Sequence, residues 1–124
     1  MAKRILVVDD CEAVRMEVAD LLRLEGFDVA AVENGADALN AVLAHRPDLI
    51  VCDVMMPRLD GFAALKVLRA NAQTAKIPFI FVTAKDAAEH QQRGMTLGAD
   101  VYIAKPFHVE QLLDAVRSQL GGGV

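Results

Sequence analysis

Five polar side chains stand directly after apolar runs of the sequence, where buried strands would end. They comprise three carboxylates, one hydroxyl and one ammonium: Asp9, Asp10, Asp53, Thr83 and Lys105. Asp53 is the clearest case, because the unbroken apolar run of residues 49–52 precedes it and predicts a strand covered on both faces. In parallel α/β sheets such strand ends form the rim at which ligands bind, so a charge there is a candidate for chemistry.

Charge restricts what three neighbouring carboxylates can do. Two carboxylates about 4 Å apart repel by roughly 4 kcal/mol at an effective dielectric of about 20, so three together require raised pKa values or a cation. Lys105 supplies one positive charge, and a divalent ion with oxygen ligands would supply the rest, which suits Mg²⁺ better than Zn²⁺. A nucleophilic carboxylate, a metal, a lysine and a hydroxyl are the groups needed for in-line phosphoryl transfer to aspartate. The alternative is a salt-bridged sheet edge without chemistry.

The elements that would position these residues alternate between strand and helix. Five apolar runs are predicted as strands: residues 5–8, 27–32, 49–53, 77–82 and 101–104. Helical spacing of apolar residues follows each run, within residues 14–22, 38–43, 62–68, about 86–97 and about 109–120. The Asn34-Gly35 pair is a turn that opens the second helix. This alternation predicts a single-domain α/β fold, a doubly wound five-stranded parallel sheet in the flavodoxin-like order 2-1-3-4-5 with helices on both faces.

The polar residues support this strand order independently. The second run, residues 27–32, ends without a comparable polar group, as expected of an outer edge strand. All five polar groups then lie on four neighbouring strands at the same carboxyl edge, across on the order of 14 Å. The long side chain of Lys105 can reach across much of that distance.

The fourth helix, predicted from about Asp86 to Leu97, should be the least secure of the five. It has few strong apolar residues, and its internal Gly94 costs roughly 1 kcal/mol relative to alanine. Gly98 is predicted to end it. In a protein that switches between two states, Gly94 and this weak apolar face would keep the free-energy gap between the states small.

Composition bounds the class of protein. The 124 residues predict one domain over residues 1–120, followed by a flexible glycine-rich tail at 121–124. A net charge of −4 argues against binding nucleic acid, which needs a concentrated basic patch. No apolar stretch reaches the roughly 18 residues of a membrane span, and the start of the chain has too few apolar residues for a secretory signal. We therefore expect a cytoplasmic protein without membrane association.

The cysteines and histidines do not predict sites of their own. Cys11 and Cys52 lack metal-ligand spacing, suit a reducing compartment, and are both expected to be small buried apolar groups. His45, His90 and His108 are isolated in the sequence and are expected on the surface, with none of them acting in phosphotransfer.

Several short motifs together resemble the receiver domain of bacterial two-component response regulators, the CheY-like family. They occur in the order and spacing of that family: Asp9-Asp10, Asp53, residues 56–61 (MPRLDG), residues 82–84 (VTA), residues 98–100 (GAD) and residues 102–107 (YIAKPF). The resemblance covers nearly the whole chain, from Arg4 to about Leu120. It implies a phospho-acceptor signalling switch that catalyses only its own phosphorylation and dephosphorylation, not a turnover enzyme.

The resemblance also assigns roles to the rim residues. Asp53 resembles the phosphoacceptor, which a histidine kinase or a phosphotransfer protein would phosphorylate. Asp10, Asp53 and the backbone carbonyl of Met55 resemble the ligands of Mg²⁺ (or Mn²⁺), and Asp9 resembles the acidic residue that holds the metal's waters. Lys105 resembles the lysine that pairs first with Asp53 and then with a phosphoryl oxygen, and its peptide bond to the following proline is expected to be cis.

A second group of residues resembles the parts that transmit and time the signal. Thr83 and Tyr102 resemble the switch pair, in which the hydroxyl moves to the phosphoryl group and the ring turns inward. The fourth helix, fifth strand and fifth helix would then present the output surface to a downstream protein or an output domain, in a monomer or a phosphorylation-dependent dimer. Met55 and Lys85 stand where side chains modulate the phosphoryl lifetime. Val101 departs from the pattern, because receivers often carry a second acidic residue there.

Two other classes of protein share part of this pattern. An aspartyl phosphatase of the haloacid dehalogenase type also forms phospho-aspartate, but Asp53-Val54-Met55 lacks the second carboxylate that its acid–base step needs, and turnover of phosphate esters would favour it. A flavodoxin-type cofactor binder shares the fold, yet Asp9-Asp10-Cys11-Glu12 would repel the phosphate that its first loop binds. The sequence also leaves open whether this is a stand-alone receiver or part of a longer regulator or hybrid kinase.

Overall fold

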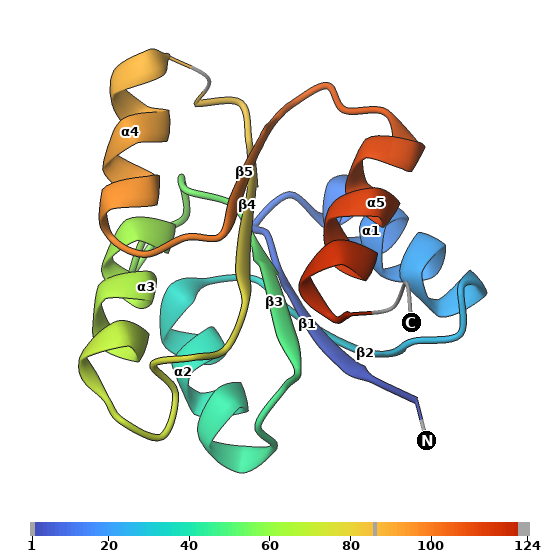
Figure 1. Cartoon of the computed structure of the whole chain (residues 1–124), viewed down its shortest axis with the longest axis horizontal. Coiled ribbons are helices and arrows are strands. Elements are labelled where there is room, and N and C mark those ends of the chain that lie inside the picture. Colours follow the sequence, from blue (N-terminus) through green and yellow to red (C-terminus); the bar gives the residue numbers. More distant parts are fainter. Residues whose placement is uncertain (1, 86, 122–124) are drawn as a thin grey trace.

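Five parallel strands form the centre of the molecule, in the order β2-β1-β3-β4-β5. The computed structural model describes residues 2–85 and 87–121 (Figure 1). The strands are β1 (Arg4–Val8), β2 (Asp28–Val32), β3 (Leu49–Cys52), β4 (Phe79–Thr83) and β5 (Val101–Ala104). Each neighbouring pair is parallel, so the predicted fold class and strand order are confirmed.

Helices cover both faces of this sheet (Figure 1). They are α1 (Glu12–Leu24), α2 (Gly35–Ala44), α3 (Gly61–Ala70), α4 (Ala88–Thr96) and α5 (Val109–Gln119). α1 and α5 share one apolar core with Ile5 and Val7 of β1, whereas α2 and α3 share the other with Leu6 and Val8. α4 lies on the same side as α2 and α3 (Figure 1). Successive residues of a central strand therefore enter different cores, which explains the unbroken apolar runs.

Strand ends differ from the prediction by one or two residues. β3 ends at Cys52, one residue early, and the next N–H after Asp53, that of Val54, donates to the Asp53 side chain. β4 begins at Phe79, two residues later than predicted. Pro78 has no N–H to donate to a ladder, and the carbonyl of Ile77 accepts a hydrogen bond of 2.7 Å from the Arg69 guanidinium instead.

α4 is buried mainly toward its carboxyl end. Among its residues, all of which the structure describes, Gly94 alone is buried. Ala87 precedes the helix and has no side-chain oxygen with which to cap it. The predicted start at Asp86 lies outside the described residues. Gly98 follows the helix with a φ of 109°, in the left-handed region expected of a glycine that ends a helix.

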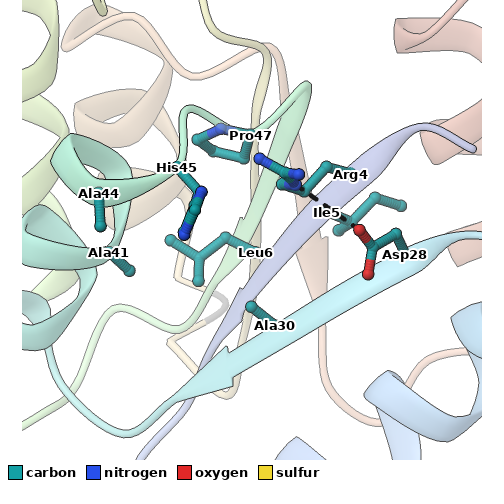
Figure 2. Close-up of a pocket in the computed structure, with 9 residues that line it drawn as sticks. All are labelled: Arg4, Ile5, Leu6, Asp28, Ala30, Ala41, Ala44, His45 and Pro47. Carbon is teal, nitrogen blue, oxygen red and sulfur yellow. Dashed lines mark ion pairs between the residues drawn. The ribbon is translucent and has the colours of Figure 1, made fainter.

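A hollow of about 280 Å³ opens at the amino ends of β1 and β2, beside α2. Figure 2 shows the Arg4–Asp28 ion pair, at 3.6 Å, on one side of this hollow and His45 and Pro47 on the other. Because the predicted polar rim is at the carboxyl ends of the strands, the hollow lies at the opposite edge of the sheet.

The two cysteines have different environments. Cys11 is exposed, so the prediction that it is buried is wrong. It stands immediately before α1, where its backbone N–H binds Asp9 and its side chain stays outside the core. Cys52 is buried as predicted, and this burial, followed by the nearby charge of Asp53, raises the pKa of its thiol well above the ordinary value.

Several surface predictions have mixed outcomes. His45 and His108 are exposed and His90 is partly exposed, as expected. Of the predicted tail, residues 122–124 lie outside the described residues, while Gly121 has a φ of 66°. Among residues 2–85 and 87–121, no helix is both long enough and apolar enough to cross a membrane.

Arg69 of α3 ties the start of β4 to the turn before β5. Its guanidinium donates to the carbonyl of Gly98 at 2.9 and 3.1 Å, as well as to Ile77. It also lies 3.3 Å from a carboxylate oxygen of Asp100, and that same oxygen accepts the N–H of Phe79 at 2.8 Å. Three segments, α3, the start of β4 and the turn before β5, therefore meet at one side chain.

Replacing Arg69 with alanine should lower the free energy of unfolding by about 2 kcal/mol, because carbonyls that accept charged hydrogen bonds lose their donor. Urea denaturation would measure the change. Lys66→Ala, at an exposed position of the same helix, is the matched control and should stay within about 0.5 kcal/mol of the unmodified protein. Equal unfolding midpoints for the two variants would contradict the prediction.

Candidate functional site

The carboxyl ends of four neighbouring strands bring the predicted polar residues together. β1 and β3 are paired in register, with Val8 opposite the last residue of β3, so Asp9 and Asp53 leave the sheet side by side. The N–H of Asp53 donates to the carbonyl of Val8 at 2.9 Å. Thr83 ends β4, and Lys105 follows β5 with its N–H on the carbonyl of Thr83 at 2.8 Å. Backbone pairing therefore places these residues side by side.

The Lys105 ammonium joins two of the carboxylates. Its Nζ lies 2.9 Å from Oδ2 of Asp9 and 2.9 Å from Oδ2 of Asp53, and both carboxylate side chains are buried. Burial by itself lowers the pKa of Lys105, but the hydrogen bonds and charges of Asp9 and Asp53 outweigh burial, so the pKa is raised. Lys105 thus stays protonated at neutral pH. Its peptide bond to Pro106 is cis, as the resemblance implied.

The Asp53 carboxylate is held in one orientation by both of its oxygens. Oδ1 accepts the N–H of Val54 at 2.6 Å and the N–H of Met55 at 3.3 Å, while Oδ2 accepts from Lys105. Asp53 is 8% exposed, so it is largely enclosed and still touches solvent. A carboxylate fixed in this way is already oriented before it meets a phosphoryl donor.

Three carboxylates are close enough to share one cation. An oxygen from each of Asp9, Asp10 and Asp53 lies within 4.8 Å of the others. Asp10 is exposed, which leaves a side open to water and to an incoming ligand. An all-oxygen set beside solvent fits a hard divalent ion that keeps several waters, as Mg²⁺ does. The donor set that was predicted therefore fits the predicted metal, while the Met55 carbonyl stays a predicted ligand.

The predicted switch residues share one backbone neighbour, Lys85. Thr83 is buried at the end of β4, and its Oγ1 accepts the N–H of Lys85 at 3.2 Å. The hydroxyl of Tyr102 donates to the carbonyl of Lys85. The ring of Tyr102 packs against Phe81, with 5.7 Å between ring centroids. One peptide segment thus lies between the hydroxyl of the site and the aromatic ring on β5.

The two residues predicted to affect the phosphoryl lifetime lie at the border of the site. Met55 is 56% exposed, although its backbone N–H contacts Asp53. Lys85 is partly exposed. Their effect on lifetime stays a prediction.

Sequence reasoning missed several groups that hold the acidic residues in place. The N–H of Cys11 donates to Oδ1 of Asp9 at 2.9 Å, and the Arg15 guanidinium donates to the carbonyl of Asp9 at 2.9 Å. Backbone amides carry no signal in residue type. Arg15 had a signal that could have been used, because a long basic residue in the first helix after two aspartates can reach back to them.

Comparison with known proteins identifies one family. Residues 5–117 match the sequence profile described as "Response regulator receiver domain". The chain is 41% identical over 120 residues to the response regulator MprA of Mycobacterium bovis, covering 97% of this chain and 51% of MprA. The chain therefore spans about half the length of the MprA proteins it matches.

Two solved structures are similar along almost the whole chain. The chemotaxis protein CheY4 of Vibrio cholerae is 32% identical, with a TM-score of 0.90 and coverage of 97% of this chain and 100% of that one. The receiver domain of the sensor histidine kinase PA1611 from Pseudomonas aeruginosa, with magnesium coordinated in its active site cleft, is 28% identical. Its TM-score is 0.90, and the match covers 98% of this chain and 99% of that one.

Removing the Lys105 ammonium should destabilise the fold. Lys105→Met leaves the buried carboxylates of Asp9 and Asp53 without their shared cation, and we expect a loss of about 3 kcal/mol in a buffer free of divalent ions. Chemical denaturation would measure it. Lys76→Met is the control, because it removes the same charge from an exposed position. A Lys105→Met variant as stable as Lys76→Met would show that the carboxylates do not depend on this ammonium.

Proposed function

Because this chain belongs to the response regulator receiver domain family, we propose that it is a signalling switch in which Asp53 accepts a phosphoryl group. The donor is a histidine kinase or a phosphotransfer protein. The observation that carries the proposal is the Asp53 carboxylate itself, which is buried, oriented by two backbone amides and paired with Lys105. A solvated strand-terminal aspartate would need none of these partners.

The transfer is a single displacement at phosphorus. An oxygen of the Asp53 carboxylate forms a bond to phosphorus while the bond from phosphorus to the donor's histidine nitrogen breaks, and the electron pair stays on that nitrogen. Lys105 then turns from compensating the carboxylate to compensating a phosphoryl oxygen. The amides of Val54 and Met55 keep the acceptor from rotating away. Less conformational entropy is therefore lost when the carboxylate and the donor reach the reactive geometry.

The acidic residues would hold a divalent cation in the same place. Asp9, Asp10, Asp53 and the carbonyl of Met55 would hold Mg²⁺ (or Mn²⁺), and the magnesium coordinated in the active site cleft of PA1611 supports this. When bound, the ion supplies positive charge that offsets the charge of the phosphoryl oxygens. Three carboxylates with one lysine carry excess negative charge, so the electrostatics of the chain itself favour a cation there.

The phosphorylated state would reach the surface through β4 and β5. If the hydroxyl of Thr83 turns to the phosphoryl group, it leaves the N–H of Lys85, and the carbonyl of Lys85 is what the hydroxyl of Tyr102 contacts. Movement of that one segment therefore changes the environment of the ring. The output surface would comprise α4, β5 and α5, facing a downstream protein or an output domain, and either a monomer or a phosphorylation-dependent dimer could present it.

The test of the acceptor is direct. Incubation with a small phosphodonor and Mg²⁺ should give a base-labile mass gain of one phosphoryl group, and removal of Mg²⁺ should abolish it. Asp53→Asn should abolish it as well, whereas Asp114→Asn, on the exposed part of α5, should retain it. Labelling that persists in the Asp53→Asn variant would refute the assignment.

A second test concerns Gly94 of α4. A Cβ built on Gly94 would lie 3.1 and 3.2 Å from ring carbons of Tyr102 and 3.3 Å from a ring carbon of Phe81, so alanine there crowds the ring. Overpacking of this kind costs about 1 kcal/mol, enough to shift the equilibrium between two ring orientations by about fivefold.

Tyrosine emission would report that shift, since the chain has one tyrosine and no tryptophan. We expect Gly94→Ala to change the emission of the unphosphorylated protein and the size of the change on phosphorylation. Gln92→Ala, exposed on the same helix, should match the unmodified protein. Identical emission from both variants, before and after phosphorylation, would rule out a role for Gly94 in the switch.

A further inference from the structure

The loop between β3 and α3, residues 53–60, is closed on itself. The N–H of Gly61 donates to the carbonyl of Val54 at 2.8 Å, which joins the two ends of the loop. A Cβ on Gly61 would lie 2.1 Å from the carbonyl oxygen of Asp53, so no side chain fits there. Arg58 takes a φ of 69°, which a non-glycine residue rarely adopts. This β3–α3 loop is thus tightly closed, and it begins at the proposed phosphoacceptor.

The first residue of α2, Gly35, contacts the β3–α3 loop. The N–H of Gly35 donates to the carbonyl of Leu59 at 3.0 Å. The Arg58 guanidinium lies 3.7 Å from a carboxylate oxygen of Asp37 in the first turn of α2. Asn34, which is 3% exposed, holds Asp37 in turn, since its Oδ1 accepts the N–H of Asp37 at 2.8 Å. Several polar contacts therefore join the start of α2 to the β3–α3 loop.

Gly35 is required there by space. A Cβ at this position would lie 2.2 Å from the carbonyl oxygen of Leu59 and 2.9 Å from its carbonyl carbon. Both are backbone atoms, which cannot move aside as the end of a flexible side chain can. Any side chain at position 35 must therefore displace the β3–α3 loop or the start of α2.

Apolar packing ties the same two segments together. Val54 and Met56 of the β3–α3 loop are buried in the apolar core that also contains Ala38 and Val42 of α2. Met55, between them in the sequence, keeps its backbone N–H on Asp53 while its side chain faces solvent. The backbone of Met55 is thus held between two buried neighbours whose core α2 completes.

We propose that the Asn34-Gly35 turn is a positioning element of the phosphoryl site. It sets the position of the β3–α3 loop through Leu59. The loop in turn sets the position of the Met55 carbonyl and the orientation of Asp53. Gly35 is a positioning residue, because it would act on the phosphoryl donor and the metal only through the β3–α3 loop that it contacts. This inference rests on the proposed function, since it assigns a role in holding the proposed cation.

The substitution Gly35→Ala tests this role. We expect it to weaken Mg²⁺ binding on the order of tenfold, measured by calorimetry, as is typical when a partner that orients a metal ligand is lost. The Mg²⁺ concentration that half-saturates the phosphorylation rate should rise by a similar factor, while the rate at saturating Mg²⁺ recovers. A general loss of stability would not produce that split.

Gly26→Ala is the matched control. Gly26 has a φ of 94°, so alanine strains the backbone there. Apart from Gly26 and its two chain neighbours, no heavy atom of the described residues lies within 4 Å of the Cβ position, so the substitution does not contact the β3–α3 loop. This variant should lose thermal stability and keep the Mg²⁺ affinity of the unmodified protein.

The outcomes separate this inference from the function on which it rests. Failure of the unmodified protein to bind Mg²⁺, or binding that survives Asp10→Asn, would overturn the proposed metal set. If the unmodified protein binds Mg²⁺ and Gly35→Ala binds it equally well, the positioning role is overturned and the proposed function stands. Should Gly35→Ala fail to fold, NMR of the unmodified protein decides: the Gly35 amide resonance should shift on addition of Mg²⁺ while that of Gly26 does not, and an unmoved Gly35 resonance would overturn the inference.

Discussion

The ammonium of Lys105 between two buried carboxylates is the interaction on which the rest of the structure depends. Asp9 and Asp53 leave adjacent strands at the same level, and their repulsion would open that edge of the sheet without a shared cation. Lys105 reaches both at 2.9 Å because its own backbone is fixed to the carbonyl of Thr83 on the intervening strand. The order of the strands therefore creates the charge arrangement. Its excess negative charge favours a divalent cation, and that cation together with Lys105 would offset the charge of a phosphoryl group.

Backbone groups complete the site more than side chains do. Two amides orient Asp53, another orients Asp9, and the loop after β3 is closed by a bond between Val54 and Gly61. Such donors are rigid, because they belong to segments that are held at both ends. The glycine at position 35 serves the same purpose from a neighbouring helix, since only a residue without a side chain lets α2 approach the loop so closely. Precision at the acceptor is thus distributed over three segments.

The proposed output surface includes α4, which is held less firmly than the site. α4 lacks a side-chain cap and buries little of itself, while Arg69 fixes the turn that follows it to α3 and β4. One end of α4 is thereby anchored more firmly than the other. Tyr102 packs beside Phe81 and Gly94, and its hydroxyl contacts the backbone next to the site. A small movement at Thr83 therefore has a short physical path to the surface of α4 and β5.

The sequence by itself determined the order of elements, the strand order and the identity of the acidic rim, because unbroken apolar runs that end in Asp9, Asp53 or Lys105 leave few other arrangements. Only the tertiary structure decided which groups hold those residues. The bond from Tyr102 to the Lys85 carbonyl, the exposure of Cys11 and the contact of Gly35 with a distant loop were not predicted. Each depends on backbone atoms, which are the same in every residue, and on how closely segments far apart in the chain approach one another.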